Sequence, residues 1–363
     1  MPEVHERRRA RLSEQLTTRG MDAALVTDLV NVRYLSGFTG SNAALLVTVD
    51  GRVVFATDGR YVDQAATQCP DVERLVSRQL TEVLVATLED HKPLRFAVET
   101  HSLSVDEHGI VAAQVTSRDG WELSSLEQAV ERLREVKDAD EIEALRTACD
   151  MSTQALAGLL AGELLGRTER ALARDLEWRM YELGAEAIAF ETIVASGPNS
   201  AIPHHEPTDR QVAVGDLLKI DFGARHAGYH ADCTRTVLVG SGADWQRDIY
   251  AAVAAAQRAG VDACVVDTPV ADVDAASRDS LASAGYLEWF TTGLGHGVGL
   301  QIHEEPLISK RHPGRLRAHT PLTIEPGIYL PGRGGVRIED TVVVTATGPE
   351  VLTHATRDLL VLD

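Results

Sequence analysis

The first part of the chain, about 135 residues, alternates between stretches with a helical spacing of apolar residues and short apolar runs bounded by turn residues. Residues 8–19 fit an amphipathic helix. The apolar runs 43–49 and 53–57 flank Asp50-Gly51, a dipeptide that favours a tight hairpin turn. This alternation predicts a small α/β scaffold.

A second part begins with a new helical signal. An apolar helical repeat that ends near residue 133 is followed by Asp138-x-x-Glu141, a capping box for a further helix. A chain of 363 residues, at roughly 150 residues per domain, also favours two domains. We therefore expect a first domain over residues 1–137 and a second over 138–363.

The second part alternates helical segments with β-rich stretches, and the β-rich stretches carry the chemically unusual residues. The expected helices are 139–163, 169–183, 245–259 and 270–284. Together the two parts predict a mixed α/β (α+β) fold.

The composition narrows the classes of protein. Apolar residues make up 44% and charged residues 25% of the chain, which is typical of a folded globular protein. The formal net charge of −19 repels polyanions, so no nucleic-acid partner is expected. The charged N-terminus and the lack of a run of about 18 apolar residues argue against secretion and a membrane span. The four cysteines form no C-x-x-C pair, which fits a cytoplasmic protein.

Two predicted hairpins carry acidic residues in otherwise apolar strands. Asp221 and Asp232 lie symmetrically about a point inside the expected turn 224–228. Glu325 and Glu339 likewise lie symmetrically about a point inside a glycine-rich turn. Residues placed in this way oppose each other in a regular hairpin, with Cβ atoms about 4.5–5.5 Å apart. We therefore expect each hairpin to hold a pair of facing carboxylates.

Facing carboxylates are destabilising, so each pair needs compensation. A single acid can form an ion pair with Arg235, Arg337 or Lys219, or lie at an exposed strand end, and for one pair we favour that explanation. Two matching pairs favour bound cations instead.

Glycines alternate with other residues around His296, in the segment GLGHGVGLQIHEEP. Missing side chains at alternate positions indicate a crowded site where the backbone approaches a ligand closely. An isolated histidine is more often structural, but this setting favours a ligand. His303 has the opposite strand parity, so both imidazoles reach one site only if the chain bends between them.

One imidazole and four carboxylates carry a formal charge of about −4, which two divalent cations balance. Oxygen-rich ligands of this kind suit Mn²⁺, Co²⁺, Fe²⁺ or Zn²⁺. Two such metals about 3.5–4 Å apart can hold and deprotonate a shared water while they polarise a carbonyl oxygen. The residues therefore predict a dinuclear hydrolase, and the acidic chain argues against a polyanionic substrate.

The segments IDFGARHAGYHADCTRT, GLGHGVGLQIHEEP, TIEPGIY and GGVRIEDT resemble the pita-bread metallopeptidases of the Xaa-Pro aminopeptidase and prolidase branch. NVRYLSGFTGSNAALLV and DGRYVDQA resemble the creatinase/prolidase N-terminal domain, so the likeness covers nearly the whole chain. Methionine aminopeptidases share the catalytic fold but usually lack this N-terminal domain. The resemblance implies a pita-bread catalytic domain, two divalent metal ions with Mn²⁺ expected first, and a homodimer.

The resemblance also implies roles for individual residues. Glu325 is the expected proton shuttle, and His303 is expected to stabilise the oxyanion or the leaving nitrogen. His204 matches a substrate-side histidine, whereas the adjacent His205 is expected to be an ordinary loop residue. Arg337 is expected to support the ligands or face the substrate. The implied metal ligands, with Asp232 and Glu339 bridging, are Asp221, Asp232, His296, Glu325 and Glu339.

Specificity is the point at which the sequence departs from the resemblance. Several prolidases have an arginine after the H-E-x-P segment that holds the carboxylate of an Xaa-Pro dipeptide, but Leu307 stands here. Lys310, Arg311, Arg315 or Arg317 can replace it. We therefore expect an Xaa-Pro aminopeptidase that prefers tripeptides, with a prolidase restricted to Xaa-Pro dipeptides as the alternative.

Two further alternatives share the fold. One is a creatinase-like hydrolase that uses no metal, and the other is a non-catalytic binding module. Loss of ligand residues would mark either of them, and this chain retains the whole set.

Overall fold

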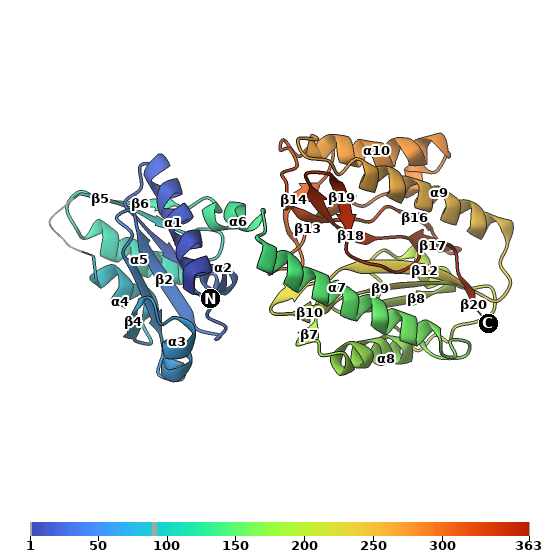
Figure 1. Cartoon of the computed structure of the whole chain (residues 1–363), viewed down its shortest axis with the longest axis horizontal. Coiled ribbons are helices and arrows are strands. Elements are labelled where there is room, and N and C mark those ends of the chain that lie inside the picture. The colour runs from blue at the N-terminus through green and yellow to red at the C-terminus, as the bar shows by residue number, and fades with distance from the viewer. Residues whose placement is uncertain (1, 89–92, 363) are drawn as a thin grey trace. The chain divides into compact units, whose positions relative to one another are not determined.

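The computed structural model describes residues 2–88 and 93–362. The chain divides into two compact units, Met1–Arg134 and Glu135–Asp363, close to the boundary expected near Lys137. Each unit has its own sheets and covering helices, so the expected mixed α/β fold is confirmed (Figure 1). Within the described residues, no helix combines the length and the apolar character that a bilayer span requires.

In the described part of the N-terminal unit, six strands form one sheet with the order β4-β3-β2-β1-β5-β6. The expected hairpin around Asp50-Gly51 is present as the antiparallel pair β2 and β3. Buried residues of α4 and α5 pack on the sheet in a common hydrophobic core. The elements are α1 (Pro2–Thr18), β1 (Ala23–Val26), α2 (Leu29–Ser36), β2 (Ala43–Thr48), β3 (Val53–Thr57), α3 (Val62–Gln68), β4 (Glu73–Val76), α4 (Leu80–Ala86), β5 (Leu94–Val98), α5 (Val105–Thr116), β6 (Trp121–Ser125) and α6 (Ala129–Arg134).

The C-terminal unit contains four long helices and a series of short strands. Its helices are α7 (Ala139–Leu160), α8 (Glu169–Glu182), α9 (Asp244–Asp262) and α10 (Val270–Ser283), with 3-10 turns at Gly197–Ala201 and Leu287–Trp289. The strands are β7 (Ala187–Ile188), β8 (Ile193–Ser196), β9 (Leu217–Phe222), β10 (Ala224–His226), β11 (Tyr229–His230), β12 (Cys233–Val239), β13 (Gly295–Gly297), β14 (Glu304–Ile308), β15 (Pro321–Ile324), β16 (Gly327–Leu330), β17 (Gly334–Arg337), β18 (Asp340–Thr345), β19 (Gly348–Val351) and β20 (Val361–Leu362).

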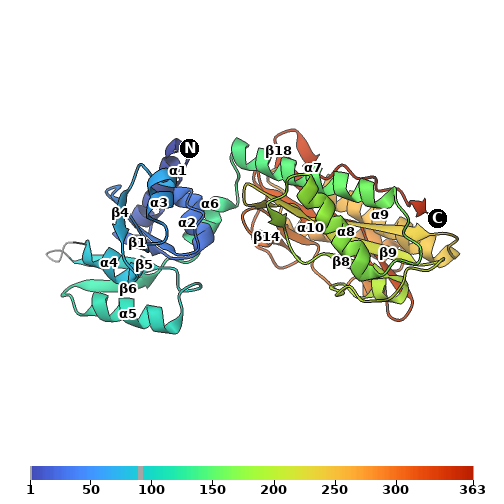
Figure 2. The ribbon, with the colours of Figure 1, turned by 90° about the horizontal axis from the view of Figure 1, so that it is seen from below.

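Two sheets of this unit lie between two helix pairs. One sheet has the order β20-β12-β9-β8 and the other β14-β13-β15-β18-β19. Buried residues of α7 and α8 pack with β8, β9 and β12, whereas those of α9 and α10 pack with β15 and β18 (Figures 1 and 2). The helices therefore cover the outer faces of the sheets, and the inner faces are left to carry polar residues.

The start of α7 follows the predicted capping box. Asp138 accepts a hydrogen bond from the backbone N–H of Glu141 over 3.0 Å, and the Glu141 carboxylate accepts from the backbone N–H of Asp138 over 2.9 Å. The four expected helices are present with ends shifted by a few residues. Local sequence therefore determines these helix starts.

The register of the first hairpin differs from the expectation. β9 and β12 pair Thr234 with Asp221, so Asp232 lies just before β12 and does not oppose Asp221. The cause is the turn, because β10 and β11 close on two residues, Ala227-Gly228, with φ values of 49° and 85°. Left-handed values at both positions are typical of a type I′ hairpin turn. The turn lies later in the chain than we expected and shifts each pair accordingly.

The register of the second hairpin agrees with the expectation. β15 and β18 pair Ile324 with Asp340, and β16 and β17 pair Gly327 with Arg337. Between these pairs the same register sets Glu325 opposite Glu339. The flanking pairs therefore agree with the predicted facing of Glu325 and Glu339, which themselves lie between the strands.

Candidate metal centre

The sequence-predicted ligands come together in one cavity of the C-terminal unit, with a volume of about 410 Å³. They arrive from β9, from the residue before β12, from β13, and from the chain around β15 and β17. The lining includes Asp221, Asp232, His296, Glu325 and Glu339, together with His204, His303 and Arg337.

Three of these residues form a cluster that could bind a metal ion. Asp232, His296 and Glu339 each offer one ligand atom, and these atoms lie within 4.8 Å of one another. His296 Nδ1 lies 3.0 Å from the carbonyl oxygen of Gly297, which fixes Nδ1 as the donor and leaves the lone pair on Nε2. Nε2 lies 3.5 Å from Asp232 Oδ2 and 3.5 Å from Glu325 Oε1. Burial lowers the pKa of His296 to about 4, so the imidazole is a neutral ligand at pH 7.

The carboxylates oppose each other's ionisation. Burial, and then the charges of Glu339, Asp221 and Glu325, raise the pKa of Asp232 well above its usual value. Burial also raises the pKa of Glu339 well above its usual value and that of Glu325 to about 7. Cations in the cavity would remove this penalty, because they favour the charged form of every carboxylate.

Asp221 provides a test of whether a cation fits. Its Oδ2 accepts a hydrogen bond from Arg337 Nη2 over 2.5 Å. Its Oδ1 is buried and has no hydrogen-bond partner among the described residues. An unsatisfied buried carboxylate oxygen is costly, and a metal ion at this position would satisfy it. The donor set of one imidazole nitrogen and four carboxylates also suits borderline divalent metals.

Thr234 and Arg337 orient two of the carboxylates through hydrogen bonds. Thr234 Oγ1 donates to Glu339 Oε2 over 2.7 Å, and Arg337 Nε donates to Thr234 Oγ1 over 2.9 Å. The ion pair that we considered for a single acid therefore exists between Arg337 and Asp221. Arg235 is used differently, since it pairs with Asp340.

The chain bends between His296 and His303, as a common site requires. β13 ends at Gly297, and the two imidazole rings lie edge to face with centroids 4.4 Å apart. Burial, and then His204, lower the pKa of His303, and both residues line the cavity. His205 is buried, and its Nε2 lies 2.8 Å from Glu169 Oε2, which fits a structural residue.

The glycines near His296 are explained by neighbouring strands. A Cβ atom on Gly295 would lie 2.0 Å from the carbonyl oxygen of Thr323, and one on Gly297 would lie 2.2 Å from that of Glu305. We expected the glycine backbone to approach a ligand closely. In the structure it instead approaches the backbones of β15 and β14. The glycines thus let three strands meet behind the imidazole.

Some residues of the site gave no usable signal in the sequence. Phe190, Ile302 and Pro207 line the cavity, but isolated apolar residues in irregular segments have no periodicity that marks them. The fully buried Glu169 was also missed. Its carboxylate accepts hydrogen bonds from Ser196, Asn199 and Thr208 and organises the loop before β9.

Leu307 does not reach the cavity. It is 51% exposed and lies outside the lining, as do the four cations considered as replacements for the missing arginine. Arg317, for example, pairs with Glu135 over 2.7 Å. Among the described residues that line the cavity, Arg337 is the only lysine or arginine.

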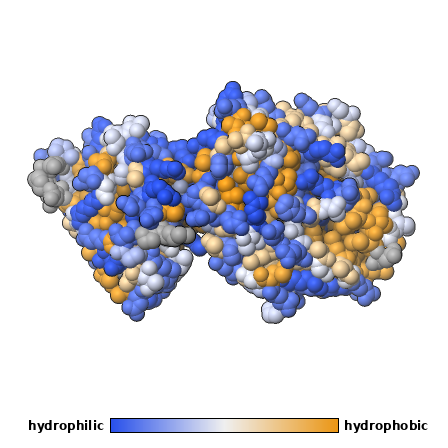
Figure 3. Space-filling model, in the orientation of Figure 1, coloured by the Kyte–Doolittle hydropathy of each residue, from blue (hydrophilic) through white to orange (hydrophobic). Residues whose placement is uncertain are grey.

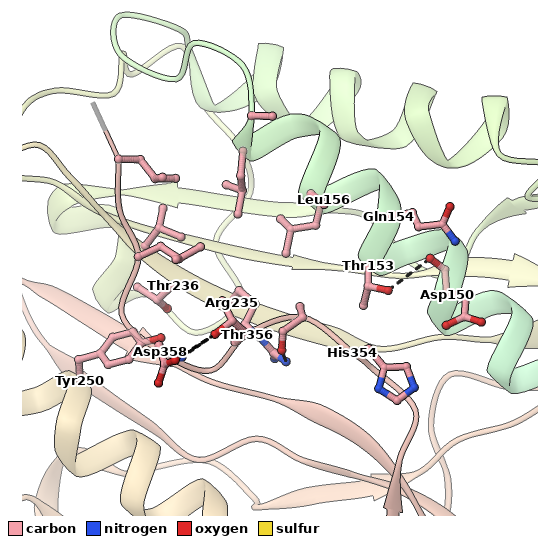
Figure 4. Close-up of a pocket in the computed structure, with 17 residues that line it drawn as sticks. Asp150, Thr153, Gln154, Leu156, Arg235, Thr236, Tyr250, His354, Thr356 and Asp358 are labelled. Carbon is pink, nitrogen blue, oxygen red and sulfur yellow. Dashed lines mark hydrogen bonds between the residues drawn. The ribbon is translucent and has the colours of Figure 1, made fainter.

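A larger cavity of about 610 Å³ lies apart from the predicted ligands (Figure 4). It is bounded by α7, β12 and the segment before β20, and apolar surface gathers beside it near the C-terminus (Figure 3). Arg235 lies at this cavity, where its Nε donates to the carbonyl oxygen of Thr356 over 2.8 Å. Arg235 Nη1 also donates to the carbonyl oxygen of Glu339. No predicted ligand lines the larger cavity, and its link to the site is the contact of Arg235 with the Glu339 backbone.

The fold and the carboxylate-rich cavity define the class of the protein. Residues 143–346 match the model of metallopeptidase family M24, and residues 8–136 match the Creatinase/Prolidase N-terminal domain. The chain therefore belongs to metallopeptidase family M24 and is a pita-bread metallopeptidase.

Individual relatives extend along the whole chain. The "Xaa-Pro dipeptidase" of Pyrococcus furiosus is 33% identical over 354 residues, which cover 96% of this chain and 98% of that protein. The structure titled "Xaa-Pro dipeptidase from Bacillus anthracis" is 34% identical, has a TM-score of 0.93, and covers 99% of this chain and 100% of its own. The X-Pro aminopeptidase structure from Thermotoga maritima is also 34% identical, with a TM-score of 0.88 and coverage of 98% and 99%.

Proposed function

We propose that this metallopeptidase hydrolyses Xaa-Pro dipeptides with two divalent cations in the cavity. The observation that carries the proposal is the convergence of Asp221, Asp232, His296, Glu325 and Glu339 beside His303 and His204. Relatives named Xaa-Pro dipeptidases, which match almost the full chain, support the dipeptide substrate over the aminopeptidase activity that we first expected.

The cations, when bound, would activate a water and polarise the scissile carbonyl. Glu325 suits the transfer of the water proton to the proline nitrogen, because its side chain is 21% exposed whereas that of Asp232 is 7% exposed. His303 would donate a hydrogen bond to the developing oxyanion, and His204 would contact the substrate beside it. Arg337 would hold the Asp221 carboxylate in place through their ion pair.

Xaa-Pro aminopeptidase activity is the second candidate. Leu307 offers no charge to a dipeptide carboxylate, and Arg337 is already engaged with Asp221. The Thermotoga maritima relative bears an aminopeptidase title.

The discriminating experiment compares Xaa-Pro dipeptides with Xaa-Pro-Yaa tripeptides and Xaa-Ala peptides on Mn²⁺-loaded protein, with Glu339→Gln as the inactive control. A higher kcat/KM for the dipeptide supports the proposal, and a higher value for the tripeptide replaces it with the aminopeptidase. In the second case Leu307→Arg tests whether a cation there shifts the ratio towards dipeptides. Hydrolysis of neither substrate overturns both candidates.

The family resemblance also supports Mn²⁺ as the native metal and a homodimer as the assembly. Activity after loading with Mn²⁺, Co²⁺, Zn²⁺ or Fe²⁺ tests the first proposal. Light scattering of the metal-loaded protein tests the second.

A further inference from the structure

Lys219 is a fully buried lysine on β9, two positions before Asp221 on the same face of the strand. Its Nζ donates to the carbonyl oxygens of Ile202 and Pro203 over 2.6 and 3.2 Å. No carboxylate in the described part of the chain forms an ion pair with it. Burial of a lysine without such a pair is rare and costly. We therefore look for the role of Lys219 in its hydrogen bonds to these two carbonyl groups.

These carbonyls belong to the turn that immediately precedes His204. Pro203 accepts a second hydrogen bond, from Arg337 Nη1 over 3.1 Å, while Arg337 Nη2 holds Asp221. Arg337 Nη1 also donates to the Tyr329 hydroxyl, and Lys219 Nζ lies 5.2 Å from the centre of the Tyr329 ring. Lys219 and Arg337 thus both hold the backbone before His204 beside the metal centre.

We propose that Lys219 is a positioning residue, which fixes the backbone before His204 and thereby sets where the His204 imidazole meets the substrate. The inference rests on the substrate-side role proposed for His204. The chain at residues 202–207 forms neither helix nor strand, so it has no backbone ladder to hold it. On its far side His205 is anchored separately by Glu169. Loss of Lys219 would therefore loosen the turn before His204, which Arg337 would then hold only at Pro203, without unfolding the loop.

The first test combines Lys219→Met and His204→Ala. Methionine keeps the volume and removes the buried amino group without touching a predicted ligand, so we expect unchanged metal content. Misplacement of His204 should lower kcat/KM for the cleaved Xaa-Pro substrate about 10-fold to 100-fold. If Lys219 acts through His204, adding Lys219→Met to His204→Ala should change kcat/KM by less than about 3-fold. The proposal is overturned if the reduction of kcat/KM in the double variant equals the product of the reductions in the two single variants.

Lys219→Gln supplies the conservative rescue. A glutamine amide can donate to one of the two carbonyls, so we expect kcat/KM between the wild-type and Lys219→Met values. A glutamine variant as impaired as the methionine variant would show that hydrogen bonding to the turn is not what Lys219 contributes.

A second test does not depend on activity. Imidazole NMR signals are recorded on Zn²⁺-loaded protein, and the His204 signal is identified by its loss in His204→Ala. Lys219→Met should shift or broaden the His204 signal and leave that of His205 unchanged. The matched control is Ser200→Ala, which removes a different loop anchor, the 2.8 Å bond to the Gly335 backbone, and should leave both signals in place.

The NMR outcome judges the positioning role by itself. An unchanged His204 signal in Lys219→Met overturns it, and so does an equal change in Ser200→Ala, which would indicate general loosening of the loop. If the wild-type protein cleaves no Xaa-Pro peptide, the proposed function fails, and the NMR comparison still decides whether Lys219 positions His204.

Discussion

Arg337 Nη2 donates to Asp221 Oδ2 over 2.5 Å and so links the second hairpin of the catalytic unit to the first. The same guanidinium donates through Nε to Thr234, which in turn donates to Glu339. Arg337 is 2% exposed, so its charge acts in a poorly solvated environment. One cation therefore orients a carboxylate from each hairpin.

Arg337→Met should impair both metal binding and catalysis. It leaves Asp221 without its ion pair among other acids, and breaking a buried pair commonly costs about 3–5 kcal/mol. We expect kcat/KM to fall at least about 100-fold, with partial recovery in Arg337→Lys, because lysine cannot bind Thr234 and Asp221 through one planar fork. Elemental analysis and steady-state kinetics measure these effects. Arg179→Met, which breaks the partly exposed pair with Asp175 on α8, should change neither.

Glu339→Gln and Asp232→Asn should abolish activity and reduce the metal content. Each change removes a charge from a residue expected to bridge two cations. Each also relieves repulsion in the metal-free protein, where the pKa values of both residues are raised by burial and neighbouring acids. At pH 8 the metal-free variants should therefore be more stable than the wild type.

Denaturant titrations with and without added metal, together with elemental analysis, check this pair of effects. Full activity and undiminished metal content in either variant would contradict the dinuclear assignment. Lower stability of the metal-free variants would contradict the repulsion.

The stability of the metal-free protein should fall as the pH rises from about 4.5 to 7. Asp232, Glu325 and Glu339 have folded-state pKa values above those of the unfolded chain, so the folded state holds more protons in this range. His296 and His5 act in the opposite direction, since burial lowers the pKa of each to about 4. The slope should become smaller in Glu339→Gln and after addition of metal. An identical slope in the wild type and the variant would refute this explanation.

His303→Ala should lower kcat by about 10²–10³, the usual cost of one oxyanion donor, while the metal content stays unchanged. The His303 ring packs edge to face on His296 but is not part of the Asp232, His296 and Glu339 cluster. Metal analysis beside kinetics separates the two roles. A fall in metal content in proportion to activity would make His303 a ligand. His312→Ala, outside the cavity lining, serves as the control.

Some of the site was determined by local sequence. The facing of Glu325 and Glu339 follows from the symmetry of one glycine-rich turn, and the start of α7 follows from the Asp138 capping box. The first hairpin shows the limit of this reasoning. Its two-residue turn at Ala227-Gly228 requires left-handed φ at an alanine. Alanine rarely adopts this conformation, so the sequence does not predict a turn at that position.

The sequence by itself predicted the proposed ligands and determined the mixed α/β fold, because periodicity and turn chemistry act over a few residues. Only the tertiary structure decided which residues support them. Arg337 and Asp221 are 116 positions apart, and Lys219 reaches its carbonyls across 16 and 17 positions of irregular chain. Such contacts depend on how separate strands and loops pack together. No local sequence pattern encodes that packing, since each of these residues could form similar contacts with many other residues of the chain.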